Sequence, residues 1–333
     1  MEKNQQTCCE KFKTTIGGQA LIEGIMMRGP EKDAIVIRKA DGELDLDIRP
    51  RKLPSKKSVA NWPFIRGVRN FFDSQVTGVK ALMHSADLAP EESQVEPSKF
   101  DQWLEKKLGN EKFQQYVIGF AVCLGLAMSI GLFILLPVII AGFFDRFIPN
   151  LLLLNLLEGV IRICIFVAYM ILVSRMGEMK RVFAYHGAEH KTIRCYEAGL
   201  ELTVDNVRKM SRLHPRCGTS FLLVVVIIST LVFSVASSAL LALIPMLAAI
   251  QGTFLYRLIM IVFKLLLLPV VVSITYEINR WTGRHDNWFT RAISAPGMWM
   301  QNFTTNEPDD SMIEVGIEAV KAVLPEKEGE DAW

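Results

Sequence analysis

Two histidines and a glutamate stand close together near the middle of the chain, as His186, Glu189 and His190. On an α-helix of 3.6 residues per turn, these three positions share one face. Two neutral imidazoles one turn apart can bind a single divalent ion, and a carboxylate beside them can act as a base toward water that the ion activates. The spacing is the reverse of the HExxH zinc motif. It predicts a divalent-metal site, with zinc as the first choice, two histidine ligands, and Glu189 as general base.

A zinc ion needs at least one further protein ligand. The nearest suitable side chains are His214 and Cys217, in a His-Pro-Arg-Cys segment. If Pro215 opens a helix, Cys217 lies in its first turn, where free backbone amides favour a thiolate that can bind a metal or act as a nucleophile. The alternative is a cysteine that only packs at the start of a helix. Cys195 and Glu197 are further candidates, but no spacing singles them out.

Long apolar segments determine the class of the protein, since half of its 333 residues are hydrophobic. Residues 117–144 hold 28 residues without a charge and residues 219–250 hold 32, and each run exceeds the ~20 residues that cross a bilayer. Residues 151–174 and 258–276 are two further apolar runs with few charges. The sequence therefore predicts an α-helical integral membrane protein with about four transmembrane helices, and the lipid bilayer as its partner.

Three ionisable residues fall inside these predicted spans. Glu158 and Arg162 are four positions apart and can pair along one helix face. Lys264 has no partner in its own span, and Glu158 is the acid that could meet it if the two helices are neighbours. The interpretations left open are structural pairing and a polar path or substrate contact.

The distribution of lysine and arginine predicts the orientation. The segment before the first span holds 19 of them, residues 175–218 hold nine and the tail after residue 278 holds five, while the short turns carry only Arg146 and Arg257. By the positive-inside rule, both termini and the loop 175–218 face the cytosol. The six cysteines then lie in the cytosol or within spans, so we expect them to be reduced. We expect no cleavable signal peptide, because the first suitable apolar run begins after residue 115.

The part before the first span, residues 1–115, is predicted to be a small cytosolic α+β domain. Residues 34–49 alternate around an Asp-Gly turn and predict a β-hairpin, and the apolar spacing over residues 64–83 predicts an amphipathic helix. Residues 89–97 are acidic and bounded by prolines, which is typical of a linker. The membrane domain then covers residues 116–278, and the remaining residues form a cytosolic tail at the membrane interface with a short helix.

The glycine-rich segment near the N-terminus, residues 16–30, suits tight turns between short extended pieces. Glu23 and Arg28 within it could reach the metal site from the cytosolic domain. The alternative, held equal, is that the segment is a structural turn whose charges pair locally.

In its glycine-rich segment and in the two histidine-containing segments, the chain resembles the YqhQ-like bacterial membrane proteins. This is a family of unknown function whose members are often labelled predicted metal-dependent enzymes. The resemblance covers nearly the whole chain and depends on residues 17–29, 185–191, 214–219 and 307–309. It implies a bacterial plasma or inner membrane location.

Two functions from different classes follow. The first is a metal-dependent hydrolase that acts on a membrane-proximal peptide bond or lipid ester, with the peptide favoured because the motif's known uses are proteolytic. The second is a non-enzymatic factor for membrane-protein assembly or stability, with a structural metal or none, whose partner would be another membrane protein or the translocation machinery. A homo-oligomer is compatible with either function. We expect no specific nucleic-acid recognition, because the positive-inside rule accounts for the basic loop.

Overall fold

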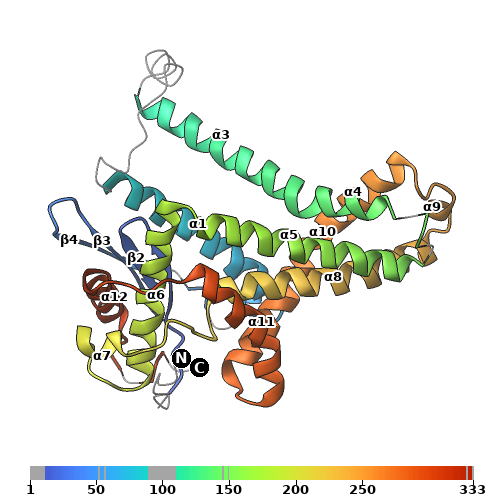
Figure 1. Ribbon diagram of the computed structural model, residues 1–333. Helices are drawn as coiled ribbons and strands as arrows, with labels where there is room; N and C mark the ends of the chain where they lie inside the picture. The colour runs from blue at the N-terminus through green and yellow to red at the C-terminus, as the bar shows by residue number, and fades with distance from the viewer. Residues whose placement is uncertain are drawn as a thin grey trace. The chain divides into compact units, whose positions relative to one another are not determined.

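The computed structural model describes residues 12–88 and 110–331, except for residues 52, 56, 57, 145, 149 and 328. The chain divides into two compact units, the first made of Met1–Ala89, Val167–Ile228 and Leu268–Trp333, and the second of Pro90–Phe166 and Ser229–Leu267. Figure 1 labels the helices and strands along the chain. The predicted linker, residues 89–97, lies outside the described residues, as do Cys8 and Cys9.

The first unit contains a four-stranded antiparallel sheet in which each strand pairs with the next one along the chain. The predicted hairpin over residues 34–49 is confirmed, with Ala34 opposite Ile48. The glycine-rich segment forms a second hairpin, whose turn holds Glu23 at a φ of 53°. The strands are β1 (Gly17–Leu21), β2 (Gly24–Arg28), β3 (Lys32–Arg38) and β4 (Leu44–Pro50).

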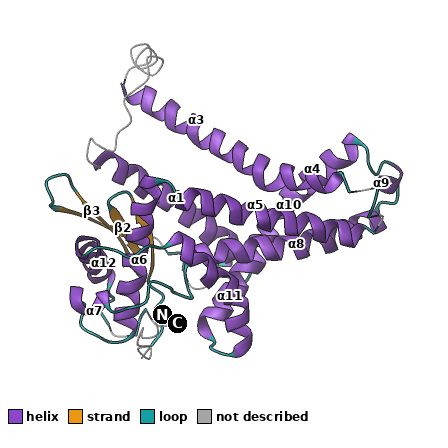
Figure 2. Cartoon of the chain, viewed as in Figure 1, coloured by secondary structure: helices purple, strands orange, loops and turns teal. Residues whose placement is uncertain are grey.

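Helices cover both faces of this sheet, which is why its central strands are continuously apolar. Helix α1 (Ile65–Leu88), which confirms the predicted amphipathic helix, packs Ala81 against one face. Helices α6 (Gly177–Glu197) and α12 (Asp310–Val323) pack against the other face, as their buried side chains share one core with β2 and β3. Figure 2 shows α6 and α12 beside the strands. Segments far apart in the sequence therefore build one core.

Within the part of the chain that the structure describes, four helices are long and apolar enough to cross a membrane, as many as the sequence predicts: Gly119–Gly142, Leu152–Ser174, Phe221–Leu243 and Phe254–Arg284. They belong to α3 (Asn110–Ile130), a π-helical turn (Gly131–Leu135), α4 (Leu136–Gly142), α5 (Leu151–Ser174), α8 (Gly218–Leu243) and α10 (Phe254–Arg284).

The segments between and after these helices are also structured. The loop after α5 holds α6 and a short helix, α7 (Val204–Arg208). The tail after α10 holds α11 (Trp288–Thr304) and then α12. The remaining short helices are Val59–Asn61 and α9 (Met246–Ala249).

Candidate metal centre

Helix α6 carries the candidate metal ligands into the interior of the first unit. His186, Glu189 and His190 are 7%, 4% and 1% exposed, so all three polar side chains are buried. On the other side of the helix, Tyr185 and Ala188 join the core under the sheet. Packing of this apolar side fixes the rotation of the helix, and the same rotation fixes where the histidines point.

A backbone carbonyl orients the ring of His186. Its Nδ1 lies 2.7 Å from the carbonyl oxygen of Thr304, at the C-terminal end of α11, and its Nε2 lies 3.2 Å from Sγ of Cys217. A carbonyl only accepts, so Nδ1 carries a proton. In the neutral ring, Nε2 is therefore the atom with a free lone pair, and it faces the cysteine.

His190 is held in the same way by a different carbonyl. Its Nδ1 lies 2.6 Å from the carbonyl oxygen of Arg212, and its Nε2 is buried without a hydrogen-bond partner among the described residues. The two rings lie beside each other, with centroids 4.3 Å apart. Metal-binding histidines are commonly oriented through the ring nitrogen that does not bind the metal. Both rings have this arrangement.

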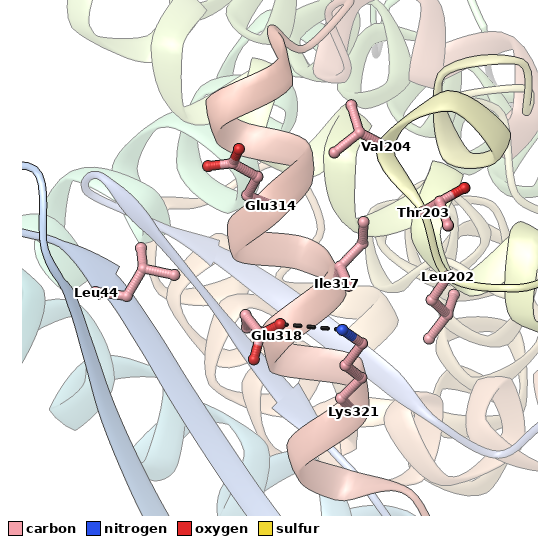
Figure 3. A pocket seen from close by; sticks show the side chains of 8 residues that line it. All are labelled: Leu44, Leu202, Thr203, Val204, Glu314, Ile317, Glu318 and Lys321. Atoms are coloured by element: carbon pink, nitrogen blue, oxygen red, sulfur yellow. Dashed lines mark hydrogen bonds and ion pairs between the residues drawn. The ribbon is translucent and has the colours of Figure 1, made fainter.

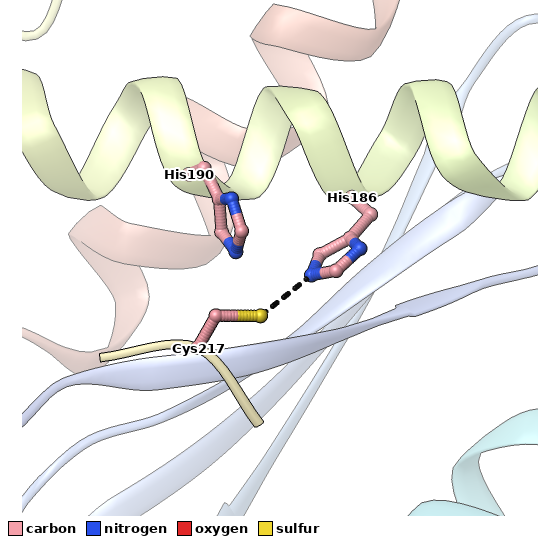
Figure 4. Close-up of side chains that lie close together, drawn as sticks. All are labelled: His186, His190 and Cys217. Carbon is pink, nitrogen blue, oxygen red and sulfur yellow. Dashed lines mark hydrogen bonds between the residues drawn. The ribbon is translucent and has the colours of Figure 1, made fainter. Parts of the chain in front are cut away.

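Cys217 completes a group of three. One ligand atom from each of His186, His190 and Cys217 lies within 4.8 Å of the other two. Figure 4 shows both rings projecting from one side of α6 toward the sulfur. Helix α8 begins at Gly218, so the expectation that Pro215 opens it is wrong: residues 215 and 216 form a turn, and Cys217 directly precedes the helix.

The charges of the three side chains are coupled. Burial raises the pKa of Cys217, but the imidazoles of His190 and His186 outweigh it and hold the pKa well below its ordinary value. Burial alone would lower the pKa of His186, yet the adjacent Cys217 raises it to about 9. Both shifts favour a proton on the His186 ring rather than on the Cys217 sulfur. A divalent cation would displace that proton, because metal ligands bind in their deprotonated forms.

Glu189 lies next to this group rather than in it. Its Oε1 accepts the backbone N–H of Gly18 at 3.0 Å, and its Oε2 is buried without a partner among the described residues. Burial raises its pKa, and the two neighbouring histidines offset part of that effect. A Cβ at position 18 would lie 3.0 Å from the Glu189 carboxyl carbon, so a glycine is needed for this approach. The glycine-rich segment thus meets the site through its backbone.

His214 lies beside His190, with ring centroids 5.6 Å apart, but it is not a member of the three-residue group. Its Nε2 lies 3.1 Å from Glu197, which also accepts hydrogen bonds from Arg216 and from the backbone N–H of Thr14. Burial lowers the pKa of His214 to about 4, so the ring is neutral and donates to the carboxylate. Burial would raise the pKa of Glu197, but His214 and Arg216 lower it. These residues hold the segment that precedes Cys217.

Neither candidate of the glycine-rich segment belongs to the three-residue group. Arg28 pairs with nearby Asp33, as the local-pairing alternative expects, and also with Asp73 of α1, 45 residues away. Glu23 pairs with Arg181 and accepts a hydrogen bond from Tyr185 at 3.2 Å, so it touches α6 one turn before the metal ligands.

Cys195 is buried, with its Sγ 3.6 Å from the carbonyl oxygen of Glu201. The three charged residues of the predicted spans come together, because Glu158 contacts both Arg162 and Lys264. Neither Cys195 nor these charged residues belong to the group of His186, His190 and Cys217.

The larger of two described pockets lies elsewhere in the first unit. It has a volume of about 420 Å³. Its lining comes from β4, from the segment that leads into α7 and from α12, and it includes Leu44, Leu202 and Ile317. Figure 3 shows an ion pair between two of its lining residues, Glu318 and Lys321. None of its lining residues belongs to the metal cluster.

Sequence reasoning missed the residues that orient the ligands. Gln301 of α11 is fully buried and bonds both backbone groups of His214, with its Oε1 2.7 Å from the amide nitrogen and its Nε2 2.7 Å from the carbonyl oxygen. Thr304 and Arg212 act through carbonyl oxygens, which any residue type supplies. Of these three residues, only Gln301 contributes through its side chain, so only Gln301 could have been recognised from its residue type.

Comparison with known proteins places the chain in a family. Residues 62–326 match the family described as "Protein of unknown function (DUF1385)". The chain belongs to the DUF1385 family. It is similar to the uncharacterized protein YqhQ of Bacillus subtilis (strain 168), with 33% identity over 319 residues that cover 94% of this chain and 93% of that protein. No solved structure matches the chain. Membership in this family confirms the resemblance and assigns no activity.

Proposed function

We propose that this protein is a membrane-embedded, metal-dependent hydrolase whose ion is held by His186, His190 and Cys217. One observation carries the proposal: backbone carbonyls bind Nδ1 of both imidazoles, so both Nε2 atoms face the same thiolate. The unpartnered Nε2 of His190 and Oε2 of Glu189 are what a site built for a further group would contain.

The donor set fits zinc. Two imidazole nitrogens and one thiolate are ligands that zinc prefers, and three protein ligands leave a fourth position for water or substrate, as in catalytic sites. When bound, the ion would act as a Lewis acid and lower the pKa of a water molecule.

The chain's own residues then have separate roles. The two histidines and the cysteine bind, and the carbonyls of Thr304 and Arg212 orient the rings. Glu189 is outside the ligand group, and Gly18 holds one of its oxygens, so the other oxygen is available to take a proton from water.

The substrate class follows from the place of the site in the chain. Helix α6 follows the candidate span Leu152–Ser174 after two residues, and Cys217 precedes the candidate span Phe221–Leu243 by three. The positive-inside pattern puts this segment in the cytosol of a bacterial cell, and both termini with it. The substrate is then a peptide bond or lipid ester at the cytosolic membrane surface, with the peptide bond favoured because inverted HExxH motifs serve in proteases.

A second function is favoured by the burial of the site. All three ligands are less than 10% exposed, and neither described pocket is lined by any of them. Closed sites are typical of structural zinc. In this alternative, the ion stabilises the first unit, and the protein assists the assembly of other membrane proteins without catalysis.

Metal content and turnover measured together test the proposal. The protein is purified in mild detergent, its metal is counted by mass spectrometry, and membrane-embedded peptides and phospholipids are examined for cleavage. His186→Ala and Cys217→Ala should lose the ion, whereas His285→Ala and Cys123→Ala, at exposed positions, should keep it.

The Glu189→Gln variant distinguishes the hydrolase from the structural alternative. A hydrolase should keep its ion and lose turnover in this variant, because the ligands remain and the base is gone. An ion bound without cleavage of any substrate in the wild-type protein supports the structural alternative. Equal metal content in wild type and in both ligand variants contradicts both.

A further inference from the structure

The second unit contains a small polar cavity among its apolar helices. The cavity has a volume of about 60 Å³ and lies between the last turns of α4, the first turns of α5 and the first turns of α10. At the roughly 30 Å³ that one water molecule takes up in the liquid, it has room for about two. That is far below the roughly 300–1,000 Å³ of a pocket for a drug-sized ligand. The cavity suits one small polar group.

The charges around the cavity do not balance. Glu158 accepts from Lys264 at 2.6 and 2.7 Å and from Arg162 at 2.6 Å. A single carboxylate thus faces two cations, and all three side chains are buried. Arg162 also donates to the carbonyl oxygen of Phe133, a neutral group. Among the described residues of this cluster, the two cations therefore exceed the carboxylate by one charge, and a buried charge without a counter-ion is costly.

Two further residues of the lining add donors and positive charge. Asn155 lies one turn before Glu158 on α5, and its Nδ2 is buried without a hydrogen-bond partner among the described residues. Arg257 lies at the start of α10, and its guanidinium rests against Gly142, where an added Cβ would be 3.0 Å from Nη2. An amide N–H, a guanidinium and an ammonium therefore line one small space. A negatively charged group rich in hydrogen-bond acceptors would accept from the Asn155 amide and would be attracted by the cations of the lining.

We propose that this cavity binds a phosphate-type oxyanion, either the phosphate of an anionic lipid headgroup or free phosphate. The helix ends that line it are those joined by the short turns of the second unit, and the positive-inside pattern puts these turns outside the cytosol. A headgroup of the outer leaflet lies at that depth, so the lipid is the favoured source. This site is separate in its residues from the metal centre and does not depend on it.

Thermal unfolding of the full chain tests the proposal. The protein is purified in neutral detergent and mixed with phosphatidylglycerol, phosphatidylcholine or inorganic phosphate. Phosphatidylglycerol should raise Tm at least about 5 °C more than phosphatidylcholine does when it is present well above its Kd. A comparable rise with inorganic phosphate alone would identify free phosphate as the source.

Variants locate the effect. Asn155→Leu and Arg257→Gln should each remove at least half of the difference between the two lipids, whereas Arg284→Gln, at an exposed position near the other end of α10, should leave it unchanged. Native mass spectrometry of the wild-type protein, which needs no variant to fold, should show phosphatidylglycerol retained in preference to phosphatidylcholine. No preference between the lipids together with no effect of phosphate, or a preference that survives both variants, would overturn the proposal.

Discussion

Nε2 of His186 lies 3.2 Å from Sγ of Cys217, although 31 residues separate the two in the sequence. The contact joins the middle of α6 to the residue before α8, and His190 adds a third ligand atom from one turn along α6. This geometry depends on how closely α6 packs against its neighbours.

Gly187 allows α6 to approach the segment after α11. A Cβ at this position would lie 2.0 Å from the backbone oxygen of Asn306, so Gly187→Ala must displace that segment and with it Thr304. We expect a loss of about 1–3 kcal/mol of stability, as for other overpacked sites, and weaker metal binding. Gly177→Ala, at the start of the same helix with nothing within 4 Å, should be neutral or slightly stabilising. Thermal unfolding of both variants is the measurement, and equal losses would contradict this account.

Gln301 positions the segment that carries Cys217. Replacing it with leucine removes two hydrogen bonds to the buried backbone of His214, each costing about 1–3 kcal/mol when left unsatisfied. Gln301→Leu should therefore lower stability and reduce metal affinity at least about tenfold, the lower end of the range for groups that orient metal ligands. The matched control is Asn302→Leu, because Asn302 is exposed on the same helix. Unchanged metal affinity in Gln301→Leu would show that the segment is held by other contacts.

Acid should destabilise the fold through His214. Its folded pKa is about 4 and its ordinary value is 6.5, so between these pH values the unfolded chain binds more protons and stability rises with pH. The pKa of Glu197 is also lowered, which adds a loss of the same sign as the pH falls further. The His214 part amounts to about 2 kcal/mol between pH 7 and pH 5. Unfolding at several pH values tests it, and His214→Asn should show a shallower pH dependence than wild type.

The fold was predictable where periodicity is strong. The four apolar helices, the β3–β4 hairpin and α1 each follow from a local pattern of apolar residues. The pairing of β1 with β2 was less visible, since glycines weaken the alternation. What local patterns could not show is that α6 and α12 cover the same face of the sheet, because this arrangement depends on contacts between segments more than 100 residues apart.

The grouping of His186, His190 and Cys217 was partly predictable from the sequence, and their surroundings were not. The spacing of His186 and His190 puts both on one face of α6, and their types indicate a metal. His214 and Cys217 were equal candidates for the third ligand by sequence. Only the fold distinguishes them, because the Nε2 of His214 is hydrogen-bonded to Glu197. The carbonyls that orient the rings have no sequence signature at all.

Lys264 and Glu158 should show strong coupling in the second unit. Lys264→Met leaves the buried carboxylate with Arg162 alone, and breaking a buried pair typically costs about 3–5 kcal/mol. Glu158→Gln leaves Arg162 and Lys264 as two buried cations, so adding Lys264→Met to it should recover part of its loss, because one of the unpaired charges is then gone. A double-mutant cycle on thermal unfolding measures the coupling. Additive losses would mean that the two side chains do not pair in the folded protein.

X-ray absorption spectroscopy of the zinc-loaded protein tests the metal centre most directly. We predict one sulfur at about 2.3 Å and two imidazole nitrogens at about 2.0–2.1 Å, with the sulfur signal absent in Cys217→Ser. A spectrum without sulfur, or one that Cys217→Ser leaves unchanged, would contradict the assignment of His186, His190 and Cys217 as the ligands.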